Sequence, residues 1–196
     1  ARKTQVDHPA LPLSPPEIAT TATNCLNAGA CMIHLHVRDE RQGHTLDPTK
    51  YASAITAIRE RVGEKLILQI TTEAVGIYKP DEQIEVVKTV KPEAASIALR
   101  EFCPDESYEQ QAGEFFMWMH KEGVSPQYIL YDEADIQRFN NYCEKGFIPG
   151  SINIGKTGMF APWVGTIIPA KSKIIIVCSL NEEKEVISRL ARIGYE

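Results

Sequence analysis

Closely spaced cysteine pairs, runs of basic residues and long apolar segments are all missing from this sequence. The five cysteines are odd in number and widely spaced, which argues against a disulfide framework and for reduced thiols. The net charge is −5 and the lysines and arginines are scattered, so we expect no nucleic-acid partner. No stretch approaches the roughly 20 apolar residues of a membrane span, so we expect a cytoplasmic protein with no membrane partner.

The bulk composition is that of an ordinary globular protein. With 196 residues, of which 43% are hydrophobic and 24% charged, the chain is long enough to bury a substantial core. It begins with Ala1 rather than methionine, and it ends at Glu196 directly after a helix-like segment. We therefore expect it to be a fragment of a longer reading frame.

Amphipathic helices alternate with short apolar strands along most of the sequence. The strand starts recur about 30 to 35 residues apart, which is the size of a βα unit. Nearly continuous apolar strands between such helices are typical of a parallel sheet covered by helices. We therefore expect an α/β fold, an incomplete (β/α) TIM-type barrel of parallel strands, with a doubly wound sheet as the alternative. The predicted helices span about 15–28, 48–62, 80–90, 106–121 and 133–144, and the predicted strands about 31–37, 66–71, 94–99 and 127–131.

Two histidines stand two residues apart near the end of the first predicted strand. Residues i and i+2 of a strand share one face and lie roughly 6.5–7 Å apart, so the rings of His34 and His36 point the same way. Neutral imidazole suits zinc and related metals, but a catalytic zinc typically takes three protein ligands. The pair is therefore half of a metal site, unless the two histidines only hydrogen-bond to nearby carboxylates.

Polar side chains follow each of the first four predicted strands. Because the carboxyl ends of parallel strands form one rim, and ligands bind there, we expect these side chains to collect around one site. The plain alternative is that each belongs to an ordinary polar loop or helix cap. The candidates beyond the histidines are Arg38, Thr71, Thr72, Glu73, Arg100, Glu101, Tyr131 and Asp132.

An ordered series of motifs resembles the β-keto acid cleavage enzymes. The resemblance covers residues 1–147, and the series is much more specific than the two histidines alone. Its motifs are DHPALP at 7–12, NAGA at 27–30, IHLHVRD at 33–39, QITT at 69–72, KPEAAS at 91–96 and PQYILY at 126–131.

The resemblance implies a (β/α) barrel that holds a divalent metal, usually zinc, through His34, His36 and a later glutamate. It also implies the reaction, in which a β-keto acid and acetyl-CoA give acetoacetate and a new CoA thioester. Thr71 and Thr72 would line the substrate site. The later glutamate belongs to strands that this chain does not contain, so we expect activity to be impaired by truncation.

Four charged side chains at the rim are the remaining candidates for the chemistry. Arg38 and Arg100 could pair with a substrate carboxylate, although each has an acidic neighbour in sequence. Glu73 and Glu101 could complete the metal site from within this chain. We expect Arg38, Glu73 and Glu101 to be catalytic and Arg100 to bind substrate. An open sheet edge would need covering, so we expect a homo-oligomer.

From about residue 146 onward the pattern changes. GFIPGSINIG at 146–155 and FAPWVG at 160–165 resemble the second half of a rhodanese domain, with a predicted strand at 173–178 and a helix at 183–194. We therefore expect two domains, 1–147 and 148–196. Cys178 stands where active rhodaneses carry the persulfide-forming cysteine, but Glu182 and Glu183 follow it and would disfavour a thiolate.

Two other functions stay open at this point. The chain could be a rhodanese-like sulfurtransferase or persulfide-binding module that uses Cys178, or an inactive α/β fragment that acts in assembly. The remaining histidines, His8, His44 and His120, need no special role. We expect the aromatic and methionine-rich run at 115–119 to pack in a core or interface.

Overall fold

The computed structural model describes residues 3–149, 160–169, 171–176, 178 and 181–195. The chain divides into two compact units, Ala1–Asp135 and Ile136–Glu196. Each unit is described by itself below. No helix in the described part of the chain is long and apolar enough to cross a membrane.

The first unit is built on a parallel sheet of four strands in the order β1-β4-β5-β6. Within this sheet, each strand pairs with the strand that follows it in sequence, so the order does not reverse among the described strands. A doubly wound sheet needs such a reversal, whereas a barrel adds strands in sequence order. The topology is consistent with a partial TIM-type barrel. The strands are β1 (Met32–Leu35), β4 (Ile67–Ile70), β5 (Ala94–Ala98) and β6 (Ser125–Ile129).

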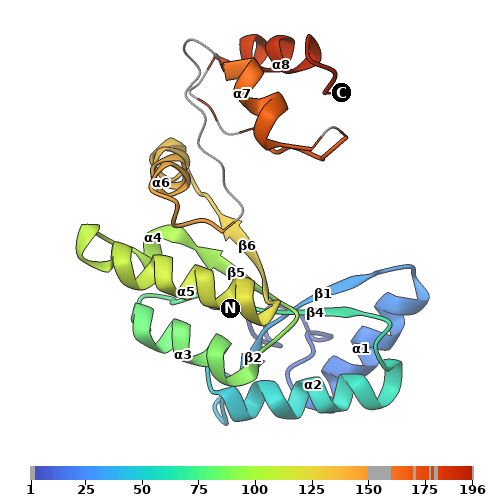
Figure 1. Cartoon of the computed structure of the whole chain (residues 1–196). Helices are drawn as coiled ribbons and strands as arrows, with labels where there is room; N and C mark the ends of the chain where they lie inside the picture. The colour runs from blue at the N-terminus through green and yellow to red at the C-terminus, as the bar shows by residue number, and fades with distance from the viewer. Residues whose placement is uncertain (1–2, 150–159, 170, 177, 179–180, 196) are drawn as a thin grey trace. The chain divides into compact units, whose positions relative to one another are not determined.

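The first unit has four long helices, of which α2, α3 and α5 follow one another along one side of the sheet (Figure 1). Local signals set their ends. Glu17 accepts from the backbone N–H of Ser14 at 2.9 Å, and the Asp47 side chain accepts from Thr49 N at 2.7 Å, so both helix starts are capped. Gly63 and Gly123 end two helices with positive φ. The helices are α1 (Pro15–Asn27), α2 (Pro48–Val62), α3 (Pro80–Val90) and α5 (Glu109–Glu122).

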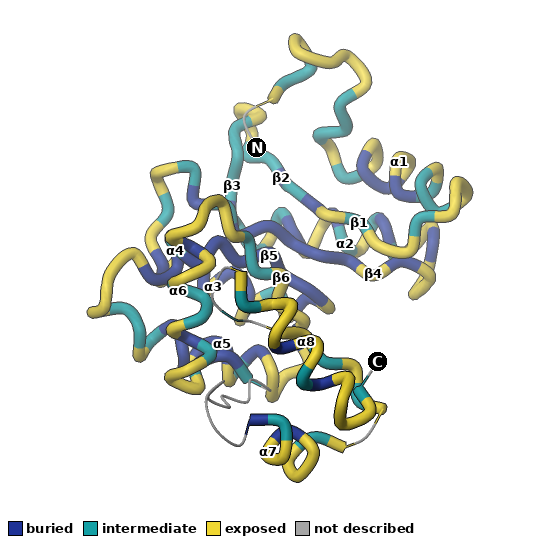
Figure 2. Tube along the Cα trace, turned by 90° about the horizontal axis from the view of Figure 1, so that it is seen from above, coloured by how far each residue is buried: buried dark blue, intermediate teal, exposed yellow. Residues whose placement is uncertain are grey.

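The core of this unit lies between the sheet and the helices. All five residues of β5 are buried, as the continuous dark-blue track in Figure 2 shows. Phe115 of α5 stacks on Phe102 with ring centroids 5.4 Å apart. Phe115, Phe116 and Met119 are buried while Met117 is 52% exposed, so the aromatic run packs one helical face into the core.

Two short features were missed by the sequence patterns. A two-stranded antiparallel hairpin, β2 (Val37–Arg38) and β3 (His44–Thr45), follows β1 directly. Asp39 Oδ1 holds its loop by accepting from Gly43 N at 2.7 Å, and a Cβ at position 43 would lie 2.9 Å from an Asp39 oxygen. The other is α4 (Leu99–Phe102), immediately after β5. The helix predicted at 106–121 begins with a single 3-10 turn at Glu106–Tyr108 and continues as an α-helix from Glu109.

The second unit contains helices and a small core. Its core consists of Phe160, Val164, Val186 and Leu190. The helix predicted at 183–194 is confirmed, although it ends at Ala191. Val186 and Leu190 form the buried face of this helix, whereas Ile187 is 54% exposed. The helices here are α6 (Glu133–Glu144), which begins in the first unit, α7 (Phe160–Ile167) and α8 (Glu183–Ala191).

The strand predicted at 173–178 is absent from the described residues 173–176. Ile175 is 92% exposed, and no described strand of this unit offers a pairing edge. An isolated apolar run has no partner for its backbone N–H and C=O groups, so it does not become a strand. Most of the GFIPGSINIG motif, residues 150–155, lies outside the described residues.

Candidate metal and substrate site

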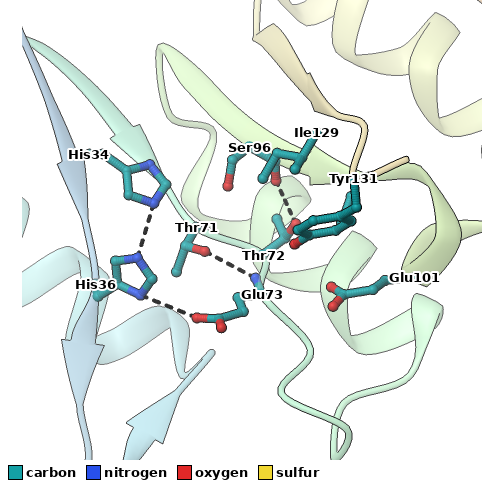
Figure 3. A pocket seen from close by; sticks show the side chains of 10 residues that line it. His34, His36, Thr71, Thr72, Glu73, Ser96, Glu101, Ile129 and Tyr131 are labelled. Carbon is teal, nitrogen blue, oxygen red and sulfur yellow. Dashed lines mark hydrogen bonds and ion pairs between the residues drawn. The ribbon is translucent and has the colours of Figure 1, made fainter. Parts of the chain in front are cut away.

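A cavity of about 150 Å³ opens at the carboxyl ends of the four parallel strands (Figure 3). Because parallel strands all end at one rim, residues far apart in sequence meet there. The predicted site residues His34, His36, Thr71, Thr72, Glu73 and Glu101 are all brought together. The full lining is His34, His36, Thr71, Thr72, Glu73, Ser96, Ala98, Glu101, Ile129 and Tyr131.

The rings of His34 and His36 face each other from β1 and the residue after it. Their Nε2 atoms lie 3.0 Å apart. His34 Nδ1 lies 2.6 Å from Gln69 Oε1, because the β1–β4 register places these two residues side by side. A carboxamide oxygen only accepts, so His34 Nδ1 carries the proton and His34 Nε2 presents a lone pair. Gln69, which is 3% exposed, was not predicted to belong to the site.

His36 is neutral, and one of its ring nitrogens makes no hydrogen bond to the described residues. Burial lowers the pKa of His36 to about 3, and the neighbouring His34 contributes. The 3.8 Å contact between His36 Nδ1 and Glu73 Oε2 is therefore not an ion pair at neutral pH. Since His34 Nε2 offers a lone pair, the His36 proton sits on Nε2, and the His36 Nδ1 lone pair faces a carboxylate. This atom is buried and has no hydrogen-bond partner among the described residues.

The β2–β3 hairpin adds a third histidine to the site. His44 Nε2 lies 2.8 Å from the backbone oxygen of Glu73, so it donates its proton there. Burial lowers the pKa of His44, which keeps the ring neutral. One ring nitrogen of His36, one of His44 and one Glu73 carboxylate oxygen lie within 4.8 Å of one another, which makes a possible metal-binding group. The sequence did not single out His44, which the structure places beside His36 and Glu73.

Two threonines and a serine form the polar wall of the cavity. Thr71 Oγ1 accepts from Glu73 N at 3.0 Å, which leaves the Thr71 hydroxyl proton to donate elsewhere. Thr72 Oγ1 donates to the backbone oxygen of Ser96 at 2.6 Å. Thr71 and Thr72 are 2% and 1% exposed, so their hydroxyls are held rigidly. Ser96 was not singled out from the sequence, because it is an interior residue of a buried strand.

Glu101 lines the cavity from α4 but is already engaged in holding the backbone. Its Oε2 accepts from Ala74 N at 2.9 Å and from Gln83 Nε2 at 3.1 Å. Gln83 Nε2 also donates to the backbone oxygen of Thr72 at 2.6 Å. The observed contacts of Glu101 therefore position the loop that follows β4, and its catalytic role stays a prediction.

The two candidate arginines are not among the described residues that line the cavity. Arg100 Nε donates to Asp135 at 2.8 Å and Nη2 to Asp132 at 2.6 Å, so its charge is compensated by two carboxylates. Arg38 Nη1 donates to a backbone carbonyl at 3.1 Å, while its Nε is buried without a hydrogen-bond partner in the described part of the chain. Their roles toward a substrate carboxylate stay predictions.

Comparisons with known proteins place this chain in a family. The model of the beta-keto acid cleavage enzymes matches residues 1–179. The match continues past residue 147, where the sequence resemblance ended, and covers most of the segment that resembles a rhodanese. The rhodanese-like character of 148–196 and the domain boundary at 147 stay predictions.

Curated relatives carry matching names. The chain is 31% identical over 153 residues to the 3-keto-5-aminohexanoate cleavage enzyme of Fusobacterium nucleatum, which covers 76% of this chain and 56% of the relative. The protein of that name from Acetoanaerobium sticklandii is also 31% identical, with 76% and 55% covered. The 3-oxoadipate:acetyl-CoA acetyltransferase of Cupriavidus necator is 24% identical, with 76% and 52% covered.

The chain spans about half the length of the curated relatives that it matches. The family model nevertheless covers most of this chain, and the paired histidines at the end of β1 face the cavity at the strand ends. This chain belongs to the β-keto acid cleavage enzyme family.

Proposed function

We propose that this chain carries the metal-binding and keto-acid-binding part of an enzyme that transfers an acyl group between a β-keto acid and acetyl-CoA. The products would be acetoacetate and a new CoA thioester. The names of the relatives support this class of reaction, since one is a cleavage enzyme for a keto acid and another an acetyltransferase that uses acetyl-CoA.

The arrangement of His34 and His36 carries the proposal. Without a metal, the His36 Nδ1 lone pair faces the Glu73 carboxylate. His34 and His36 would hold the metal, and the His36 ring could then carry its proton on Nδ1 and donate it to Glu73. Both ligands would then donate their second ring N–H to an oxygen, which is the usual support for histidine ligands.

The metal, zinc or another divalent ion, would polarise the keto oxygen and stabilise negative charge during C–C cleavage. Side chains of this chain would bind and orient the substrate. The Thr71 hydroxyl retains a proton to donate to a bound oxygen, and Ala98 and Ile129 provide an apolar wall. Glu73 would hold the His36 ring in place. We keep Arg38, Glu73 and Glu101 as the proposed catalytic residues and Arg100 as a proposed contact to the substrate carboxylate.

A complete site would need more than these residues. By the family resemblance a later glutamate is the third metal ligand, and this chain would meet it through the remainder of a longer protein or through assembly. We propose a homo-oligomer in the cytoplasm as the working form. The sulfurtransferase that uses Cys178 stays a separate prediction, tested by alkylation of Cys178 and a thiosulfate:cyanide assay.

Metal content is the first test of the proposed function. Elemental analysis of the purified chain should find near-stoichiometric zinc or another divalent metal, and the His34→Ala/His36→Ala double variant should lose it. The zinc-loaded chain is then assayed for acetoacetate formation from acetyl-CoA and a β-keto acid. Absence of metal from both proteins, even after incubation with zinc, would contradict the proposal.

Replacing Gln69 should weaken metal binding without removing a ligand. Gln69→Leu deletes the acceptor that fixes the His34 tautomer, and loss of such a partner typically costs 10- to 100-fold in metal affinity. Gln69→Glu keeps an acceptor and should retain most of the affinity. Competition of the chain with a zinc-responsive chelator measures both. Equal affinities for Gln69→Leu and the unmodified chain would show that Gln69 does not orient His34.

A further inference from the structure

We propose that His36, His44 and Glu73 form a second metal position in this chain, for a zinc-class transition metal. It is distinct from the position between the Nε2 atoms of His34 and His36. All three ligands come from residues 36–73 and none from outside the chain. The proposal does not depend on the acyl-transfer function.

The tautomer of His44 is already that of a metal ligand. Its Nε2 donates to the backbone oxygen of Glu73 at 2.8 Å, so its Nδ1 carries the lone pair. His44 Nδ1 is buried and has no hydrogen-bond partner within the described residues. Histidine ligands usually donate their second ring N–H to a backbone carbonyl or a carboxylate, which is the observed arrangement. A histidine buried in the core for structural reasons alone would instead have a hydrogen-bond partner on each ring nitrogen.

His36 offers its other nitrogen to this position. Its Nε2 faces His34, while its Nδ1 lone pair lies 3.8 Å from a Glu73 carboxylate oxygen. The His36 Nδ1 lone pair and the negative Glu73 oxygen repel each other. A cation bound to both atoms would replace this repulsion by two attractive contacts. The proton on His36 Nε2 could then stay in its hydrogen bond to His34 Nε2.

The donor set and its spacing indicate the metal. Two imidazole nitrogens and one carboxylate oxygen are the ligands of many open zinc sites, and they leave one position for water or a substrate oxygen. One ring nitrogen of His36, one of His44 and one carboxylate oxygen of Glu73 lie within 4.8 Å of one another, and three ligand atoms must approach to about 3.4 Å around a tetrahedral ion. The side chains of His36 and Glu73 are 26% and 37% exposed, so both have room to make this movement.

The two metal positions compete for one ring. A neutral His36 ring has one lone pair, on Nε2 or on Nδ1, so a single chain binds at one position or the other at neutral pH. His34→Ala should therefore leave a chain that still binds one metal, through His36, His44 and Glu73. His44→Ala should leave a chain that binds through His34 and His36.

The test is a titration with Co²⁺, whose visible absorption reports coordination, on the full 196-residue chain. In the His34→Ala background, one equivalent of Co²⁺ should still bind. A further His44→Ala or Glu73→Gln change should weaken Co²⁺ binding by more than about tenfold, because loss of a ligand costs at least as much affinity as loss of the residue that orients a ligand. His120→Ala in the same background is the matched control, because His120 is exposed on α5. Circular dichroism verifies that each variant is folded.

Two results would overturn the second position. One is a folded His34→Ala chain that binds no Co²⁺, and the other is binding in that background that neither His44→Ala nor Glu73→Gln weakens. Failure of the proposed function would give a different result. If no metal binds between His34 and His36, His34→Ala would leave the metal affinity of the chain unchanged. The two proposals therefore fail independently.

Discussion

Alanine at position 36 is expected to abolish tight metal binding by this chain. His36 is the one ligand that both metal positions share, through Nε2 toward His34 and through Nδ1 toward Glu73. Without His36 the first position keeps only His34 and the second keeps only His44 and Glu73, so each position loses one of its ligands. The loss should exceed that of His34→Ala or His44→Ala, since each of these leaves one position intact. We expect at least about 100-fold weaker binding, above the 10- to 100-fold range for supporting residues.

The measurement is direct competition for zinc between the chain and a chelator of known affinity. His120→Ala removes an exposed histidine from the same unit and should leave the affinity unchanged. His36→Gln retains a polar side chain of similar length and should bind as poorly as His36→Ala, because an amide is a weak zinc ligand. A His36→Ala chain that binds zinc as tightly as the unmodified chain would exclude both positions.

Alanine at position 115 is expected to cost about 3–5 kcal/mol of the free energy of unfolding of the first unit, the usual range for a buried phenylalanine. Phe115 is 1% exposed, and its ring lies between Phe102 and Trp118 with centroid distances of 5.4 and 6.1 Å. Phe102 belongs to α4, which also carries Glu101. A cavity at Phe115 would therefore loosen the helix that holds the loop after β4.

Urea unfolding followed by tryptophan fluorescence measures this cost. The chain has two tryptophans, so a Trp163→Phe background leaves Trp118, in the first unit, as the only reporter. Met117→Ala on the same helix is the matched control. Met117 is 52% exposed, and its replacement should change the free energy of unfolding by no more than about 0.5 kcal/mol. Similar midpoints for Phe115→Ala and Met117→Ala would contradict the assigned core.

Local patterns predicted the elements of the first unit closely. The helix expected at 80–90 is observed at Pro80–Val90, and the strand expected at 94–99 is Ala94–Ala98. These segments combine a clear apolar period with end signals in the adjacent residues. The strand expected at 173–178 failed over its described part because strand formation depends on a pairing partner, which sequence periodicity does not report.

The contacts of the charged residues were less predictable. Arg100 was expected to face a substrate carboxylate, yet Asp132 and Asp135, more than 30 residues away in sequence, compensate its charge. Its guanidinium also lies over the ring of Tyr131, 4.7 Å from the centroid. A polar residue at a strand end marks the rim, but its partner depends on which loops meet there.

By itself, the sequence determined the alternation of helices and strands, the shared face of His34 and His36, and the rim on which the candidate residues gather. These follow from the period of two in strands and from the common direction of parallel strands. Only the tertiary structure decided the tautomer of His34, through Gln69 of a neighbouring strand, and the entry of His44 into the site. Both depend on strand register and on a hairpin held by Asp39, because hydrogen bonds between distant segments exist only once the chain has folded.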